Sequence, residues 1–470
     1  MLRLVGILAL LVLSACTTTR KVTILHFSDY HSHAVPFYVD GEGESAGIAR
    51  AFGYVKPLSE REDVLVFNGG DTMNRGAPAW SDKYGCIEWA WWNGVVDAMA
   101  YGNHDADYGT ETFSRCVDSI EYPILGANVV AGDGQPVFLH GGKPYAVFDR
   151  GGVRVGVFAL AGRDFETLVG ESSSPASEVR FRDRATVGRE VVEALRNEER
   201  VDAVVLIGHA STEDDESLAR EVAGIDLILG THSHRLESPR RIDGTDTWIL
   251  SPGQYLTHVS RAELTVGRSG LTIAGDLVAM ASERIEDESM AARVAGLQRE
   301  LELDPSYAEL FRVIGSLDEP LSNAGVNERN TPLGSFVMTA ILDDAHTDGA
   351  ASTSSSFRGS LPSGVIRETD LRDVLPYDNR LLRYELSGDA LSALLELIAS
   401  RRGTDSFCQT AGELDAIDST RSYSVAVTDY MAKVSADYRQ FFSRLEPVDV
   451  GITVRESVRR ALAGSPAKDR

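Results

Sequence analysis

Short apolar runs alternate with amphipathic segments through the first half of the chain. Runs of β-branched and aromatic residues that end at a glycine or a polar residue predict strands. Apolar residues at helical spacing between those runs predict helices. The predicted strands are residues 22–27, 64–67, 122–130 and 152–162, with two more runs that end at residues 209 and 230. The predicted helices are residues 85–99, 184–196 and 216–222. This alternation is typical of βα units, in which a sheet is buried on both faces.

The second half of the chain predicts a separate unit. Residues 281–307 have helical periodicity and many charges, which predicts a helix that links two domains. From residue 313 strands and helices alternate again, and they include a predicted amphipathic helix at residues 333–345. The small, serine-rich segment 350–358 lies within this unit. The chain is therefore expected to be a two-domain α/β protein.

Composition and charge narrow the class of protein. The chain has 470 residues, of which 43% are hydrophobic and 25% charged, a globular composition with room for two to three domains. The formal net charge is −24 and the pI about 4.8. Such a surface repels nucleic acid, and the chain has no basic run with interleaved aromatics. A small anionic substrate would need a local positive charge to bind.

The first residues predict export. Arg3 precedes an apolar run at residues 4–13 that is too short to span a bilayer, as in a signal peptide. The run ends in LSAC, which resembles a bacterial lipoprotein cleavage box. Cleavage would remove residues 1–15 and leave Cys16 as a lipid-bearing N-terminus, followed by a tether at residues 16–21. The predicted location is membrane-anchored, in the periplasm or on the cell surface. The alternative is a plain secretory signal cut nearby.

Three cysteines remain beyond the signal. Cys86 and Cys116 flank a polar stretch at residues 101–109, whereas Cys408 lies far from both. In an oxidising compartment Cys86 and Cys116 can form a disulfide, but two buried thiols are equally compatible with the sequence. No spacing indicates a thiolate metal site.

Polar residues with metal-ligand character follow several of the predicted strands. The carboxyl ends of strands in an open α/β sheet form the usual ligand-binding edge, so these side chains are expected to converge. Mixed carboxylate, amide and imidazole donors suit Mn, Zn, Co or Fe better than calcium. They exceed what one tetrahedral ion needs and fit two ions that share a bridging carboxylate, for which Asp71 is the natural candidate. The predicted ligands are Asp29, His31, Asp71, Asn103, His209, His232 and His234.

Two ions at such a site predict phosphoryl chemistry. A two-metal site clamps a phosphoryl group and activates a water as nucleophile. Two aspartates against two divalent ions leave roughly two positive charges, which offsets the acidic surface. His104 is not needed as a ligand and can protonate the leaving oxygen, with Asp107 as its orienter. The alternative for the stretch around His104 is a polar turn that caps a helix.

Five motifs in order identify a family resemblance. They are DYH at residues 29–31, GGD at 69–71, GNHD at 102–105, GH at 208–209 and GTHSH at 230–234. This series resembles the calcineurin-like metallophosphatase domain of the 5'-nucleotidase family, and the second unit resembles that family's C-terminal nucleotide-binding domain. The resemblance implies an αββα β-sandwich followed by a smaller α/β substrate-binding domain. With the chain pattern, this predicts a catalytic domain at residues 22–283, a linking helix at 284–312, a C-terminal domain at 313–463 and a polar tail at 464–470.

The resemblance also assigns roles. It implies that Asp107 and His104 are the catalytic pair. One metal is implied to take Asp29, His31, Asp71 and His234, and the other Asp71, Asn103, His209 and His232.

The substrate-binding segments depart from the family. Tyr377 and Tyr430 stand where the family sandwiches a nucleobase, and Arg358 matches a family arginine. However, TSSSFR replaces the family's Asn-Gly-Gly-Gly-Ile-Arg, VSAD replaces Gly-Gly-Asp-Gly, and Asn327 stands where an arginine is expected, although Arg329 is close. Ordinary half-buried tyrosines are the alternative interpretation of Tyr377 and Tyr430.

The predicted function is hydrolysis of the phosphate ester of 5'-nucleotides by a metal-activated water. The partner is then a small phosphorylated substrate. The alternatives are the same chemistry on nucleotide sugars such as UDP-sugars, on cyclic nucleotides or on a sulfur ester, or a non-catalytic surface-binding lipoprotein.

Overall fold

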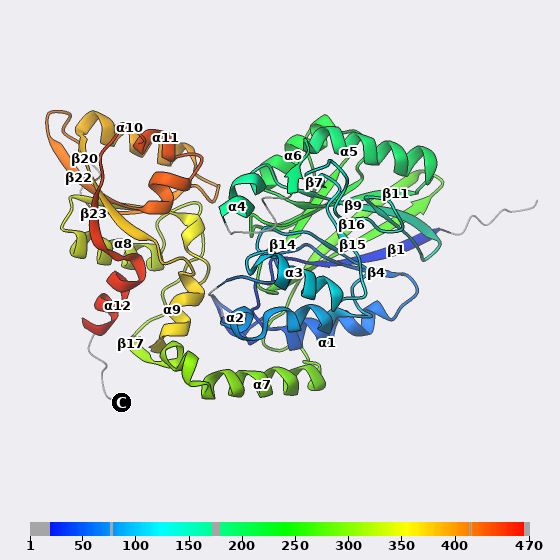
Figure 1. Cartoon of the computed structure of the whole chain (residues 1–470), viewed down its shortest axis with the longest axis horizontal. Helices are drawn as coiled ribbons and strands as arrows, with labels where there is room; N and C mark the ends of the chain where they lie inside the picture. Colours follow the sequence, from blue (N-terminus) through cyan, green and yellow to red (C-terminus); the bar gives the residue numbers. More distant parts are fainter. Residues whose placement is uncertain (1–18, 76–78, 172–178, 413, 415, 465–470) are drawn as a thin grey trace, which may run out of the picture.

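The computed structural model describes residues 19–75, 79–171, 179–412, 414 and 416–464. The predicted signal peptide and Cys16, and residues 465–470 of the predicted tail, lie outside the described residues. The chain forms two units that lie side by side, one coloured blue to green and the other yellow to red (Figure 1). Among the described residues, no helix has both the length and the apolar character needed to span a membrane.

Two six-stranded sheets form the N-terminal unit. The first has the order β16-β15-β1-β4-β5-β6 and the second β13-β14-β12-β11-β9-β8. The strands of the first sheet are β1 (Arg20–Phe27), β4 (Val64–Asn68), β5 (Ala98–Ala100), β6 (Ile124–Leu125), β15 (His258–Gly267) and β16 (Gly270–Ala279). Those of the second are β8 (Ala146–Arg150), β9 (Val153–Ala161), β11 (Ala203–His209), β12 (Leu227–Gly230), β13 (Leu236–Arg241) and β14 (Trp248–Pro252).

Alternate residues of each strand enter different cores, because side chains point to opposite faces of a sheet. Ile24 and Phe67 of the first sheet pack with Val155 and Val205 of the second. Outward residues such as Leu25 pack with helices α1 (Ile48–Ser59) and α7 (Glu288–Leu303). The outer face of the second sheet is covered by α5 (Arg184–Glu193) and α6 (Thr212–Glu221). The predicted αββα sandwich is confirmed.

Two predicted elements were wrong. Residues 85–99 form a 3-10 helix only at Gly85–Trp92, and the chain then enters β5. β5 pairs in parallel with both β4 and β6, so its three residues complete the sheet instead of extending a helix. The predicted strand at residues 122–130 is two short strands, β6 and β7 (Val129–Ala131), and β7 pairs with β10 (Val179–Phe181) outside the main sheets.

A disulfide ties together two of the short helices that lie around the sandwich. Cys86 and Cys116 form a disulfide, which resolves the alternatives that the sequence left open. Cys116 belongs to α3, so the bridge ties this helix to the 3-10 helix before β5. The short elements are β2 (Phe37–Val39), β3 (Gly43–Ser45), α2 (Trp80–Tyr84), α3 (Gly109–Asp118) and α4 (Phe165–Glu171).

The C-terminal unit is a five-stranded sheet with helices on both faces. The sheet has the order β21-β18-β22-β20-β23, and a separate pair joins β17 to β19. Helices α8 and α12 pack with one core, and α10 and α11 with the other. The strands are β17 (Val313–Leu317), β18 (Gly349–Thr353), β19 (Gly364–Arg367), β20 (Arg380–Ser387), β21 (Cys408–Gly412), β22 (Ser422–Thr428) and β23 (Val448–Thr453). The helices are α8 (Pro332–Ala345), α9 (Glu368–Val374), α10 (Gly388–Ser400), α11 (Arg439–Phe442) and α12 (Val454–Gly464).

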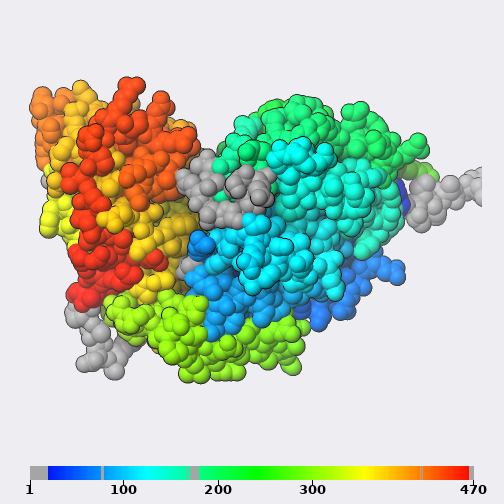
Figure 2. All heavy atoms as spheres, in the orientation of Figure 1, coloured from blue at the N-terminus to red at the C-terminus, as the bar shows by residue number. Residues whose placement is uncertain are grey.

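Helix α7 leads from one unit to the other, and a 3-10 turn at Pro305–Phe311 follows it. Met290, Val294 and Leu301 of α7 are buried in the core of the N-terminal unit. The helix therefore packs along the base of this unit and is not a free connector (Figure 2).

Candidate active site

The predicted ligands come together at one edge of the sandwich. Their loops follow the carboxyl ends of β1, β4, β5, β11 and β12. Ligand atoms of Asp29, His31 and His234 lie within 4.8 Å of one another, and so do those of Asp71, His209 and His232. The two groups sit beside each other, since His31 Nε2 is 3.8 Å from Asp71 Oδ2.

Asp71 belongs to the second group and also approaches the first. Its Oδ2 is 3.3 Å from His209 Nε2 as well as 3.8 Å from His31 Nε2. Its Oδ1 accepts a hydrogen bond of 2.8 Å from the His104 backbone N–H. Burial would raise the pKa of Asp71, but the imidazoles of His209 and His104 hold it well below its usual range. The ionised carboxylate is therefore placed to bridge two cations.

The orientation and burial of the ligand atoms fit the binding of divalent cations. His209 Nδ1 donates to the Gly69 carbonyl at 2.7 Å, which leaves Nε2 as the ring nitrogen that can bind a cation. Asn103 Oδ1 and His209 Nε2 are buried and have no hydrogen-bond partner among the described residues. Burial without a partner costs free energy, and a cation would remove that cost. Burial lowers the pKa of His209, but the nearby Asp71 carboxylate raises it, and the pKa is about 9. Cation binding at this imidazole therefore displaces a proton.

Backbone strain accompanies these ligands. Non-glycine residues seldom adopt positive φ, and strained backbone clusters at functional sites. Positive φ occurs at five of the ligand residues, namely Asp29 (50°), His31 (47°), Asp71 (50°), His232 (58°) and His234 (54°). The loops thus direct these side chains at the site in a strained backbone conformation. Packing of the two sheets offsets the free energy of that strain.

His104 and Asp107 form a hydrogen-bonded pair beside the ligands. His104 Nδ1 donates to Asp107 Oδ2 at 2.8 Å, and the Asp107 N–H donates to the His104 carbonyl at 3.0 Å. The His104 ring lies edge-on to His31, with 5.2 Å between ring centroids. Its side chain is about one-fifth exposed and lines a cavity. The carboxylate holds the ring through Nδ1, so Asp107 does not engage Nε2.

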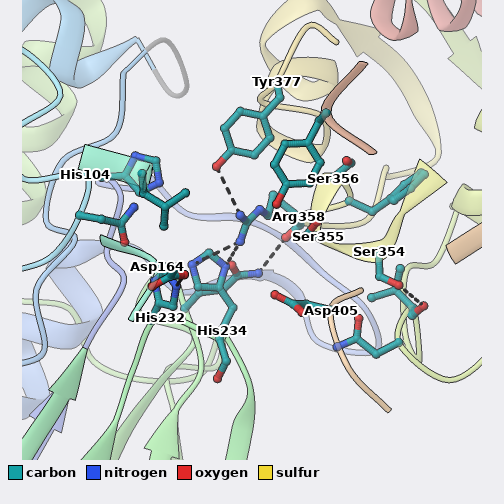
Figure 3. Close-up of a pocket in the computed structure, with 18 of the residues that line it drawn as sticks. His104, Asp164, His232, His234, Ser354, Ser355, Ser356, Arg358, Tyr377 and Asp405 are labelled. Atoms are coloured by element: carbon teal, nitrogen blue, oxygen red, sulfur yellow. Dashed lines mark hydrogen bonds and ion pairs between the residues drawn. The ribbon is translucent and has the colours of Figure 1, made fainter. Parts of the chain in front are cut away.

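The cavity has a volume of about 500 Å³ and lies between the two units. The N-terminal unit contributes His104, His232 and His234, and the C-terminal unit contributes Arg358 and Tyr377 from the opposite wall (Figure 3). Metal ligands and the predicted substrate-binding residues therefore face one space.

Two family models match the chain. Residues 22–236 match calcineurin-like phosphoesterase, and residues 313–416 match the 5'-nucleotidase C-terminal domain. The chain belongs to the 5'-nucleotidase family. Catalytic domains of this calcineurin-like class use two divalent metal ions, and the two ligand groups around Asp71 are the candidate positions for them.

Relatives cover nearly the whole chain. A 5'-nucleotidase of Vibrio parahaemolyticus is 24% identical over 479 residues, spanning 90% of this chain and 82% of that protein. The 5'-nucleotidase precursor of Thermus thermophilus has the same fold, with a TM-score of 0.73, 23% identity and coverage of 94% of this chain and 96% of that one. The sulfate thiohydrolase SoxB of Thermus thermophilus also shares the fold, with a TM-score of 0.72, 20% identity and 94% coverage of both chains.

One arginine makes several contacts on the C-terminal wall of the cavity. Arg358 Nη2 donates to the Tyr377 hydroxyl at 3.3 Å, and the guanidinium carbon lies 5.6 Å from the Tyr377 ring centroid. Arg358 Nη1 also contacts His234 Nδ1 and lies 3.3 Å from His234 Nε2. Tyr430 lines the same cavity. Burial and the charge of Arg358 lower the pKa of His234 to about 4. The ring is therefore neutral and can offer a nitrogen lone pair to a cation.

The departures from the family pattern also lie at this wall. Ser354–Ser356 form a 3-10 turn in place of the glycines, and the Ser354 hydroxyl donates to the Val326 carbonyl at 3.0 Å. Asn327 lines the cavity, whereas Arg329 donates to the Ala324 carbonyl at 3.0 Å and is not among the lining residues. Arg329 therefore does not replace the missing family arginine in this structure.

Two carboxylates that contact the predicted ligands were missed from the sequence. Asp105 Oδ2 accepts from the N–H groups of Asp71 at 3.1 Å and Gly102 at 2.9 Å, so it ties two ligand loops together. Its place in the GNHD motif was the available signal. Asp164 lies 3.0 Å from His232 and lines the cavity, but it follows β9, whose end carries no predicted ligand.

Proposed function

We propose that this protein is a metal-dependent phosphoesterase that hydrolyses the phosphate ester of 5'-nucleotides. The observation that carries the proposal is the position of Asp71. Its carboxylate belongs to one imidazole–carboxylate group and lies 3.8 Å from His31 of the other. It also accepts the backbone N–H of His104, whose side chain lines the same cavity. Such an arrangement suits in-line displacement at phosphorus, with no covalent intermediate on the enzyme.

Seven side chains are proposed to hold two divalent ions, of Mn, Zn, Co or Fe. Asp29, His31 and His234 would hold one, Asn103, His209 and His232 the other, and Asp71 would be shared. When bound, the ions supply Lewis-acid polarisation of the phosphoryl oxygens and activation of a water. His104 would hydrogen-bond or protonate the leaving oxygen from outside the ligand set, while Asp107 keeps its Nε2 directed at the cavity.

Substrate would be gripped from the C-terminal unit. Arg358 is the guanidinium that lines the cavity, and a guanidinium pairs well with phosphate oxygens. Tyr377 and Tyr430 are proposed to contact the base. Tyr377 is 37% exposed in this structure, so its ring is available to a ligand.

The remaining sequence predictions complete the proposal. Export with a lipid on Cys16 would place the enzyme in the periplasm or on the cell surface, where extracellular nucleotides are its substrates. The domain limits at residues 22–283, 284–312 and 313–463 are proposed with it.

A substrate panel tests this function. Purified protein would be assayed for release of phosphate from a 5'-mononucleotide. In parallel, a nucleotide sugar, a cyclic nucleotide and a sulfur ester would be assayed by chromatography of the nucleoside monophosphate or sulfate that their hydrolysis yields, and every assay would be run with added Mn²⁺ and with chelator. We expect chelator-sensitive release that is fastest from the mononucleotide. Faster turnover of another substrate would replace the substrate assignment. Absence of metal and of turnover in every arm would support a binding lipoprotein instead.

A further inference from the structure

Asp164 makes a contact with the metal-site histidine His232 that no predicted role explains. It follows the carboxyl end of β9, and its Oδ2 lies 3.0 Å from His232 Nε2 (Figure 3). A neutral imidazole donates from one ring nitrogen and presents a lone pair at the other. Because Asp164 takes the proton on Nε2, Nδ1 is the nitrogen left to bind a cation. A carboxylate in this position also makes the ring a stronger ligand.

The loop around Asp164 is shaped for this contact. The buried Phe165 ring lies 5.7 Å from the His209 ring and 6.3 Å from the His232 ring, centroid to centroid. A Cβ at Gly162 would lie 2.6 Å from Asp164 Oδ1 and 3.1 Å from the His209 carbonyl, so glycine leaves room for the carboxylate. The Leu168 N–H donates to the Asp164 carbonyl at 3.0 Å, which starts helix α4 at this point. The segment thus supports both imidazoles of one ligand group.

The two ligand groups differ in the charge of the side chain that contacts their histidine from the GTHSH motif. His234, in the group with Asp29 and His31, has Arg358 against its ring, whereas His232 has a carboxylate. The backbone N–H of His232 donates to Asp29 at 3.0 Å, so its main chain is held independently of its ring. Removal of the Asp164 carboxylate therefore acts on the ring of His232 and leaves the loop in place.

We propose that Asp164 is a positioning residue for the cation held by Asp71, Asn103, His209 and His232. It fixes which nitrogen of His232 faces that cation and raises the affinity of that position alone. The inference rests on the proposed two-cation site but not on the identity of the substrate.

Calorimetric titration of metal-free protein with Mn²⁺ tests the proposal, with Mn²⁺ electron paramagnetic resonance to count coupled pairs. In Asp164→Ala we expect one of the two Mn²⁺ affinities to fall about 10- to 100-fold, the effect usual for an outer partner of a metal ligand. The other affinity stays at the wild-type value. In Asp164→Asn the affected Mn²⁺ affinity is expected to lie between those of Asp164→Ala and the wild type. The amide oxygen still accepts the ring N–H but carries no charge.

Glu166→Gln is the matched control, because it removes the same charge two residues away on the exposed side of α4. It should bind Mn²⁺ as the wild type does. Thermal unfolding in chelator should show equal stability for Asp164→Asn and the wild type, which separates positioning from folding.

Three results would overturn the proposal. The first is Asp164→Ala binding two Mn²⁺ ions with wild-type affinities. The second is an equal loss at both positions, or the same loss in Glu166→Gln, which would show a general charge effect. The third is a wild type that takes up fewer than two Mn²⁺ ions, which would remove the two-cation site itself and is recognised without any variant.

Discussion

His104 and Asp107 are joined by a 2.8 Å hydrogen bond from Nδ1 to Oδ2, and the pair stands outside both ligand groups. His104→Ala should therefore keep its cations and lose turnover by about 10²- to 10⁴-fold, the usual contribution of a positioned general acid. Steady-state kinetics together with metal analysis of the same sample measure both properties.

Asp107→Asn tests the orienting role. The amide can still accept the Nδ1 proton but no longer carries a charge, so a smaller loss than in His104→Ala is expected. A His104→Ala protein with near-wild-type rate would contradict the assignment, and one that has lost its metal would place His104 in the ligand set.

Arg358→Ala should raise KM more than it lowers kcat. A charge-assisted hydrogen bond to phosphate contributes about 1.5–3 kcal/mol, which corresponds to roughly 10- to 100-fold in binding. Arg329→Ala is the matched control, because that side chain bonds to the Ala324 carbonyl and does not line the cavity. An equal rise of KM in both variants would mean that Arg329 reaches the substrate after all.

Much of the site was predictable because its residues follow strands. A buried apolar run that ends in Asp or His marks a strand end, and parallel strands of one sheet end at the same edge, so the pattern alone brings Asp29 near Asp71. β5 was missed because Ala98–Ala100 is too short to show a period of two. Asp164 was missed for a different reason. It follows a strand directly, but its role depends on a histidine 68 residues away, and no local pattern encodes that contact.

Docking of the two units was likewise beyond the sequence. Asp40 Oδ2 accepts from Ser322 Oγ at 2.6 Å, Ser360 Oγ at 2.7 Å and the Asn323 N–H at 3.3 Å. These four polar residues have no periodicity and lie on three separate loops, with Ser322 and Asn323 adjacent on one of them. Only the folded surfaces bring them together.

Asp40→Ala should loosen this docking. The variant leaves three donors of the C-terminal unit without their shared acceptor, and a loss of about 1.4 kcal/mol would raise the undocked population tenfold. Small-angle scattering should give a larger radius of gyration for the variant than for the wild type. Glu44→Ala, on the same hairpin in β3 and exposed, should scatter as the wild type does. Identical curves for all three proteins would show that Asp40 does not control docking.

Glu88 should make stability depend on pH. This side chain is fully buried beside Trp89, and the hydroxyl of Tyr30 donates to its Oε1. Burial raises the pKa of Glu88 from 4.5 to about 7, although the hydrogen bonds from Tyr30 and Ser32 act in the opposite direction. The folded protein thus binds a proton more tightly than the unfolded chain between these values. The stabilisation is complete below about pH 4.5 and is lost as the pH rises through about 7, by up to roughly 3 kcal/mol.

Glu88→Gln removes this titration and keeps an oxygen that can accept the Tyr30 hydroxyl. Free energies of unfolding would be measured by denaturant titration in chelator from pH 5 to pH 8. The difference between the variant and the wild type should shift in favour of the variant as the pH rises, because only the wild type must ionise a buried carboxyl. A difference that stays constant across this range would show that Glu88 is ionised throughout, and its burial would then have to be offset by Tyr30 and Ser32 alone.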